Sequence, residues 1–313
     1  MDQTNIKKNT LLRQMVRGRV GYLMIAPLIV GLLVFCYYPS VYGLALAFFD
    51  KTSTQPAVFC GFDNFIRLMQ DSIFLNSIGT MFLLMIPKLI INVVAPLIMA
   101  ELIFAVDSKK MQGVFRVLVL LPIVAPGVVS MLIWRNVLNP ADGLLTEIVR
   151  MFGFVDKEMP INWLDDPDLV IFSVIFIGFP WVGGTSVLIY ISGLMNISDE
   201  VIEASRLDGA STMRRIMFID LPLLKGQLKY FIIFGIIGGF QDYGTQYVLT
   251  DGGPGYSTYV PGFYMYKLAF AYDNMGYGAS IGALLFVVIF AVSGFMFRYM
   301  DIGGMRNKNN GVY

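Results

Sequence analysis

The amino-acid sequence predicts an all-α polytopic membrane protein with six transmembrane helices. Its mean hydropathy is +0.67, and hydrophobic side chains make up 56% of the 313 residues. Charged side chains make up only 14%, well below the roughly 25% of soluble domains. Six apolar stretches are long enough to cross the hydrocarbon core of a bilayer, which takes about 20 helical residues. We expect these spans at residues 21–48, 73–106, 114–138, 169–195, 228–250 and 277–300.

The first span is expected to stay in the protein as a membrane anchor. It follows a basic segment, as the apolar region of a signal peptide would. However, it is longer than such a region, and no small-residue cleavage site follows its end at Phe48. We therefore expect a transmembrane domain over residues 21–300, between cytoplasmic segments 1–20 and 301–313.

Prolines interrupt the next three spans. Pro87 and Pro96 lie in the second span, Pro122 and Pro126 in the third, and Pro180 in the fourth. Each proline removes one backbone donor from a helix, so we expect kinks at these positions. Such kinks are ordinary in membrane helices, but they also occur where backbone faces a water-filled path.

The distribution of basic residues orients the chain. With six spans, both termini lie on one side of the membrane, and 16 of the 23 lysine and arginine residues fall on that side. The opposite loops hold six, and Lys88 falls inside the second span. Because loops rich in basic residues stay in the cytoplasm, we expect both termini to be cytoplasmic.

The composition argues against chemistry on a substrate. Histidine is absent, which removes the commonest general base and metal ligand. Cys36 and Cys60 lack the spacing of a disulfide framework or a zinc site, so we expect no metal, no cofactor and no catalytic residue. A net charge of +1 gives no field that would attract nucleic acid. The sequence also lacks the Gly-x-x-x-x-Gly-Lys-Ser/Thr phosphate loop, so any ATP hydrolysis needs a separate protein.

The loop between the fourth and fifth spans, residues 196–224, predicts a cytoplasmic helix-turn-helix. Ser198 can cap a first helix, and Gly209 provides the left-handed residue at which that helix ends. Ser211 can cap a second helix, which Pro222 closes. Helical spacing predicts one apolar face and one basic face. The inward residues are expected to be Ile197, Val201, Ala204, Met213, Ile216 and Met217, with Arg206, Arg214 and Arg215 pointing outward.

This loop resembles the EAA motif of the permeases of binding-protein-dependent ABC importers. Glu203-Ala204, Asp208-Gly209-Ala210 and Ile219-x-Leu221-Pro222 stand at the offsets of that motif. Ser205 and Gly226 depart from it, but neither lies at the Asp-Gly turn. Other stretches are similar to the carbohydrate-uptake permeases of the maltose and multiple-sugar type. They are Tyr38-Pro39, residues 61–65, Leu121-Pro122, Ala125-Pro126, residues 161–164 and residues 249–254.

The resemblance covers residues 22–300 and implies the type I ABC importer permease fold. It implies that the chain is not itself an enzyme and forms half of a translocation pathway in a bacterial plasma membrane. The implied partners are a second permease, two ATP-binding cassette subunits that bind ATP and Mg, an extracytoplasmic solute-binding protein and membrane lipid. The residues implied to couple to the ATPase are Glu203, Ala204, Arg206, Asp208, Gly209, Ala210, Leu221 and Pro222.

The fifth span carries polar and aromatic residues that a lipid-facing helix would avoid. Asp242 stands out, because an intramembrane carboxylate is costly unless it is paired or hydrated. Amides, carboxylates and aromatic faces are also groups that bind sugars. The resemblance points to the same span and adds two residues of the fourth. The predicted substrate residues are Trp181, Thr185, Phe240, Gln241, Asp242, Tyr243 and Gln246.

Three alternatives stay open at the level of sequence. Phe240 and Tyr243 could pack between helices while Asp242 pairs with Lys88. The cargo could be a polyol or glycerol phosphate rather than a di- or oligosaccharide, which would favour positive charge along the path. The third is a self-sufficient secondary carrier, although the first and last three spans show no convincing inverted repeat.

Overall fold

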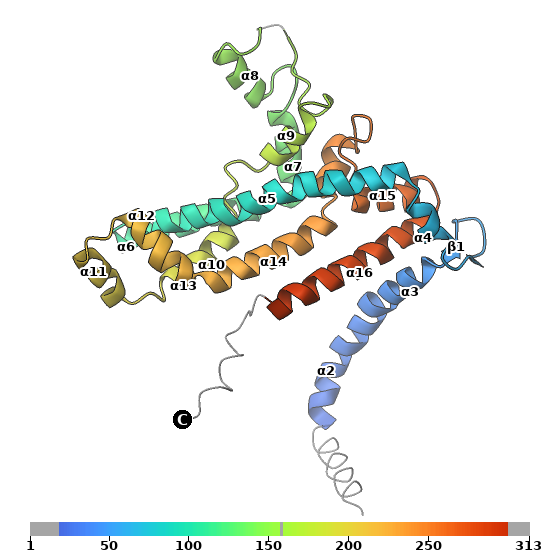
Figure 1. The fold of residues 1–313 in the computed structure, drawn as a ribbon, viewed down its shortest axis with the longest axis horizontal. Coiled ribbons are helices and arrows are strands. Elements are labelled where there is room, and N and C mark those ends of the chain that lie inside the picture. The colour runs from blue at the N-terminus through green and yellow to red at the C-terminus, as the bar shows by residue number, and fades with distance from the viewer. Residues whose placement is uncertain (1–18, 157–158, 300–313) are drawn as a thin grey trace, which may run out of the picture.

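The computed structural model describes residues 19–156 and 159–299, which are mostly helical (Figure 1). The predicted terminal segments lie outside the described residues, apart from residues 19–20. Three helices are long and apolar enough to span a membrane without interruption. The first is built from α2 (Arg19–Leu32), a π-helical turn (Leu33–Tyr37) and α3 (Tyr38–Leu46), and the others are α5 (Ser72–Phe104) and α16 (Met275–Tyr299).

The third predicted span is a bent pair of helices. α6 (Lys109–Leu120) continues through a 3-10 turn (Leu121–Val124) and meets α7 (Gly127–Val137) at 89°. Pro126, with an extended ψ of 142°, occupies the break, as proline chemistry predicts. Pro87 and Pro96, in contrast, lie inside α5 without ending it.

The chain also bends where it enters the fifth predicted span, residues 228–250. α12 (Thr212–Arg215), a π-helical turn (Ile216–Asp220) and α13 (Leu221–Leu223) run into α14 (Lys225–Gln241) with a bend of 71°. Asp242 ends α14 with an extended backbone, and a further π-helical turn follows (Gln246–Thr250). The span therefore leaves the regular helix at the polar residues that the sequence singled out.

The fourth predicted span is not one helix. α9 (Val170–Phe176) and α10 (Gly184–Leu194) are separated by the irregular segment 177–183. Gly178 and Trp181 have positive φ values of 93° and 56° there, which no α-helix accommodates. The span predicted at residues 169–195 is therefore interrupted around Pro180, as expected of a proline, and the interruption divides it into two short helices. The described residues hold three uninterrupted spans and two bent ones, and six crossings stay a prediction.

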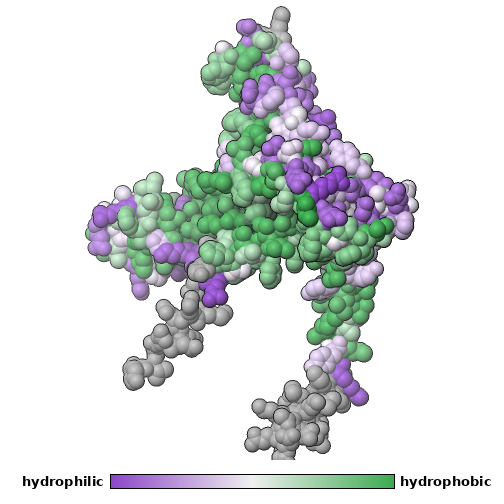
Figure 2. Space-filling view, turned by 45° about the vertical axis from the view of Figure 1, so that its right-hand side comes forward, coloured by the Kyte–Doolittle hydropathy of each residue, from purple (hydrophilic) through white to green (hydrophobic). Residues whose placement is uncertain are grey.

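α5 is the central helix of the body (Figure 1). It packs against both α10 and α14. Its N-terminal half contributes Phe74 and Leu84 to one buried cluster, and its C-terminal half contributes Ala100 and Ile103 to another. Figure 2 shows the surface of this body as an apolar band between hydrophilic ends, as expected of a membrane protein.

Short elements gather at the end of the body where α5 begins (Figure 1). They are the antiparallel strands β1 (Phe49–Asp50) and β2 (Val58–Phe59), α4 (Asp63–Leu68) and α15 (Pro261–Tyr266), which continues into a π-helical turn (Lys267–Ala271). A lobe containing α8 (Leu144–Met151) projects sideways from the body, above α7 and α9 (Figure 1). Leu138, Ile161 and Trp163 form the lobe's own buried cluster.

Asp71 fixes this end of α5 to its neighbours. Its Oδ1 accepts hydrogen bonds from the backbone N–H groups of Ile73 and Phe74, which caps the helix. Its Oδ2 accepts from the hydroxyl groups of Tyr264 and Tyr277, each at 2.7 Å. Burial alone would raise the pKa of Asp71, but these four hydrogen bonds hold it below its ordinary value. One ionised carboxylate thus joins α5, α15 and α16.

The predicted helix-turn-helix lies at the opposite end of the body (Figure 1). α11 (Asp199–Leu207) ends before Gly209, whose φ of 72° confirms the left-handed turn. Ser211 accepts a hydrogen bond from the backbone N–H of Arg214 and caps α12 as expected. Ser198 stands at the cap position of α11 but makes no capping hydrogen bond. Pro222 does not close the second helix, because a proline near the first position of α13 is compatible with helical backbone.

Arg215 points into the protein rather than outward, which corrects the prediction from helical spacing. Its guanidinium pairs with Asp220 at 2.9 Å and with Glu101 of α5 at 3.6 Å. The Asp220 side chain is fully buried, and those of Arg215 and Glu101 are 12% and 8% exposed. Arg215 turns inward despite the amphipathic pattern because a buried carboxylate is stabilised only with a cation within reach, and two such carboxylates lie here. The triad joins the helix-turn-helix to the C-terminal end of α5.

Candidate functional site

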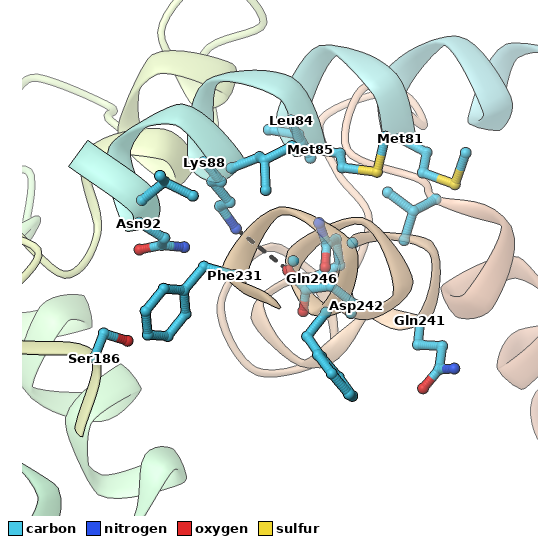
Figure 3. A pocket seen from close by; sticks show the side chains of 17 residues that line it. Met81, Leu84, Met85, Lys88, Asn92, Ser186, Phe231, Gln241, Asp242 and Gln246 are labelled. Atoms are coloured by element: carbon cyan, nitrogen blue, oxygen red, sulfur yellow. Dashed lines mark hydrogen bonds and ion pairs between the residues drawn. The ribbon is translucent and has the colours of Figure 1, made fainter. Parts of the chain in front are cut away.

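A pocket of about 490 Å³ lies between α5 and α14, with one contribution from α10. Of the described residues that line it, two are charged: Lys88 of α5 and Asp242 at the end of α14. Figure 3 shows Lys88 reaching across to Asp242, and their charged atoms are 3.4 Å apart. The two side chains are 22% and 42% exposed, so both ions of this pair are accessible from the pocket.

The pocket lies halfway along the membrane-spanning body. Lys88 is the middle residue of the 33-residue helix α5. At 1.5 Å per residue it is about 24 Å from either end. A charge at that depth is costly in lipid and is found where it is paired or faces water. The position therefore marks a polar interior site.

Uncharged polar side chains extend the pocket on both sides of the ion pair. Asn92 lies one helical turn after Lys88, and Ser186 of α10 lies on the same side of the ion pair in the view of Figure 3. Gln241 lies on the opposite side of the pair in that view, and Gln246 also lines the pocket (Figure 3). The Gln246 side chain is 1% exposed, and its Oε1 has no hydrogen-bond partner among the described residues. A hydroxyl group of a ligand reaches this acceptor only if the side chain moves, because the oxygen is buried.

Three of the predicted substrate residues come together here: Gln241, Asp242 and Gln246. Phe240 is instead buried and packs edge-on against Phe82 of α5, at 5.9 Å between ring centres. Tyr243 stacks on Tyr266 and lines a separate pocket of about 300 Å³.

Trp181 and Thr185 are not among the residues that line the larger pocket. The indole N–H of Trp181 donates to the backbone carbonyl of Ile175, and its ring packs edge-on against Phe179. Ser186, next to Thr185 in the sequence, is the residue of α10 that reaches the pocket. Trp181 itself lies in the irregular segment 177–183, outside α10.

The pairing of Asp242 with Lys88, the alternative that the sequence left open, is present. It does not replace the pocket, because the same pair lines it. Sequence reasoning missed Asn92, Ser186, Phe231 and Phe234 as lining residues. A signal for Asn92 existed, since residues i and i+4 share one helix face and Asn92 follows Lys88 by four.

The predicted coupling residues lie on a protruding surface. Glu203, Ala204, Arg206, Asp208 and Gly209 are exposed, Pro222 is exposed, and Ala210 and Leu221 are half-buried. Large apolar side chains are exposed beside them, among them Leu207 at 88% and Phe218 at 75%. Four residues that were expected to face inward are also exposed: Val201, Ala204, Met213 and Met217. On the second helix, Arg215 and Asp220 occupy the buried side instead.

A helical membrane body, a polar pocket at mid-depth and an exposed apolar knob at one end define a multi-pass membrane transport protein. The chain belongs to the family of binding-protein-dependent transport system inner membrane components, whose pattern matches residues 80–302. The family that the motifs predict is thereby confirmed, and so is the resemblance to carbohydrate-uptake permeases, because relatives of that kind match nearly the whole chain.

Several relatives align over most of their length. The probable ABC transporter permease YurN of Bacillus subtilis is 29% identical over 91% of this chain and 97% of its own. The arabinooligosaccharide permease AraP of Bacillus subtilis is 30% identical over 87% of this chain and 85% of its own. The trehalose/maltose permease MalF of Thermococcus litoralis is 30% identical over 92% and 95%.

The fold matches a solved bacterial ABC transporter that imports the acidic polysaccharide alginate. The TM-score is 0.80 at 24% identity, covering 93% of this chain and 98% of that one. A second structure of the alginate transporter, in complex with its periplasmic protein bound to an alginate pentasaccharide, gives the same score at 23% identity. These matches establish the permease fold.

Proposed function

We propose that this chain is the permease subunit of an ATP-driven importer for a di- or oligosaccharide and forms half of its translocation pathway. The observation that carries the proposal is the polar pocket at the middle of α5, lined from three helices. Its two amides from the fifth predicted span, Gln241 and Gln246, and the paired charges offer both donors and acceptors to hydroxyl groups. Phe231 and Phe234 supply aromatic surface for the C–H faces of a sugar ring.

The state of Lys88 favours a saccharide over glycerol phosphate. A phosphate carries nearly two negative charges and needs unpaired cations. Lys88 is the one basic residue among those lining the pocket, and Asp242 already neutralises it. The names of the relatives AraP and MalF point to sugars as well.

The proposed partners are inferred in part from an exposed apolar surface of the chain. Apolar side chains such as Leu207 and Phe218, exposed beside the turn at Gly209, form a surface that would be costly to leave in water. We assign it to a separate ATPase, which binds ATP and Mg and lies in the cytoplasm together with both termini. A second permease completes the pathway, two ATPase subunits drive it, and an extracytoplasmic solute-binding protein delivers the sugar.

Co-purification tests the assembly. A tagged copy isolated from native membranes is expected to bring down an ATPase and a second permease, and the complex reconstituted in vesicles is expected to import sugar only with ATP. Transport by the purified chain alone would contradict the proposal and would favour a self-sufficient carrier.

Gly238→Leu is expected to abolish sugar uptake while leaving the complex assembled. Gly238 lines the pocket, and a Cβ atom at this position would meet no atom within 4 Å. The leucine side chain is therefore expected to occupy the cavity without disturbing the packing between helices. Uptake of radiolabelled sugar by vesicles measures the effect. Gly294→Leu on α16 is the matched control, because its Cβ atom also meets nothing within 4 Å. Equal uptake by the two variants would remove the pocket from the pathway.

A further inference from the structure

We propose that the Lys88–Asp242 pair makes the pocket selective for uncharged saccharides over acidic ones. The inference rests on the proposed function of the pocket as a saccharide site and names the charge class of its cargo. Relatives of one fold are named for lactose, for arabinooligosaccharides and, in the solved structure, for the acidic polysaccharide alginate. The fold therefore leaves the charge of the cargo undetermined, and within this chain the side chains that line the path are the groups that can select it.

The lining residues carry no net charge. Lys88 and Asp242 have opposite signs and lie 3.4 Å apart, and the other lining residues are neutral. The next charged residue along α5 is Glu101, about 20 Å further on at 1.5 Å per residue. No second charge of α5 therefore compensates a charged ligand in this pocket.

An acidic sugar is expected to bind beside this pair more weakly than a neutral sugar. Its carboxylate would have to leave water at mid-depth in the membrane, where an uncompensated charge is costly. Attraction to Lys88 is offset by repulsion from Asp242, because the two opposite charges lie only 3.4 Å apart. A neutral sugar has no such cost, since its hydroxyl groups can accept from Lys88 and donate to Asp242.

The pair is also placed where a ligand can reach it. The two side chains are 22% and 42% exposed, and Asn92 and Ser186 lie at one end of the pair (Figure 3). A buried structural ion pair would be shielded from the cavity. This one forms part of the cavity wall.

Thiol protection in the assembled transporter tests the inference. Gly238→Cys is introduced with Cys36→Ser and Cys60→Ser, because Gly238 lines the pocket and has open space at its Cβ. The probes are β-1,4-mannotriose and its acidic counterpart trimannuronate, and maleimide labelling of this chain is read after electrophoresis. The ratio of the two protection constants reports charge selectivity. We expect mannotriose to protect the thiol at least about tenfold better, a difference of ~1.4 kcal/mol.

Charge variants then change this ratio in opposite directions. Asp242→Asn leaves Lys88 unpaired and is expected to shift the ratio toward trimannuronate by at least about tenfold, whereas Lys88→Gln shifts it further toward mannotriose. The double variant Lys88→Gln/Asp242→Asn restores zero net charge without an orphaned ion, so its ratio is expected to return close to the starting value.

Two results would overturn the inference in different ways. Charge selection by the pair is contradicted if both sugars protect the thiol equally, or if Asp242→Asn leaves the ratio of protection constants unchanged. The pocket would still be a saccharide site in either case. Protection by neither sugar contradicts the saccharide site, and the inference falls with the proposed function.

Discussion

Arg215→Met is expected to destabilise the junction between the helix-turn-helix and α5 by about 3–5 kcal/mol, the cost of leaving buried charges without their partner. The variant would place the carboxylates of Glu101 and Asp220, 8% and 0% exposed, near each other with no cation between them. Thermal unfolding of the purified chain in detergent measures the loss, and sugar-stimulated ATP hydrolysis by the complex measures its effect on coupling.

Arg214→Met is the matched control for this prediction, because Arg214 is the adjacent residue and is exposed. Its unfolding midpoint should stay close to that of the unchanged protein. Adding Glu101→Gln and Asp220→Asn to Arg215→Met should recover much of the lost stability, since the uncompensated charges are then gone. If Arg215→Met and Arg214→Met unfold alike, the triad does not hold the junction together.

Gly209→Val is expected to lower sugar-stimulated ATP hydrolysis roughly 5–30-fold, the factor that corresponds to one or two kcal/mol. Gly209 has a φ of 72°, and a side chain in this left-handed conformation costs about 1–2 kcal/mol. A Cβ atom there would meet nothing within 4 Å, so the effect comes from the backbone rather than from a clash. Hydrolysis by the reconstituted complex, with and without sugar-loaded binding protein, is the measurement.

Gly209→Asn separates backbone strain from the simple loss of a glycine. Asparagine visits the left-handed conformation routinely, and the space around this position is open. Its hydrolysis should therefore remain close to that of the unchanged complex. If sugar stimulates ATP hydrolysis by the valine variant as strongly as by the unchanged complex, the conformation of this turn does not contribute to coupling.

The sequence predicted the class of fold and the location of the long helices, because hydropathy depends on composition alone. It could not predict which prolines break a helix. Pro87 and Pro96 are accommodated within α5, whereas Pro122 and Pro126 stand one turn apart and Ala125 before the second is extended. In the fourth span, Pro180 lies beside two residues with positive φ. Whether neighbouring helices satisfy the freed carbonyl groups is a property of the packed structure.

The site could be predicted from the sequence where a polar residue interrupts an apolar span. Asp242, Gln241 and Gln246 are polar in an apolar segment, and all three line the pocket. Phe240 and Tyr243 were ambiguous, because an aromatic side chain suits both a sugar face and a helix contact. Arg215 illustrates the converse error. Helical spacing placed it outward, yet its two acidic partners lie five residues ahead and on another helix, and only the folded chain brings them together.

α5 is anchored at both ends, to α15 and α16 through Asp71 and to the helix-turn-helix through Glu101. Between these anchors it is a single 33-residue helix with Lys88 at its centre. If this rod pivots rigidly about its Asp71 end, a sideways displacement at Glu101 moves Lys88 by roughly half as much, since Lys88 lies at about half the distance from Asp71.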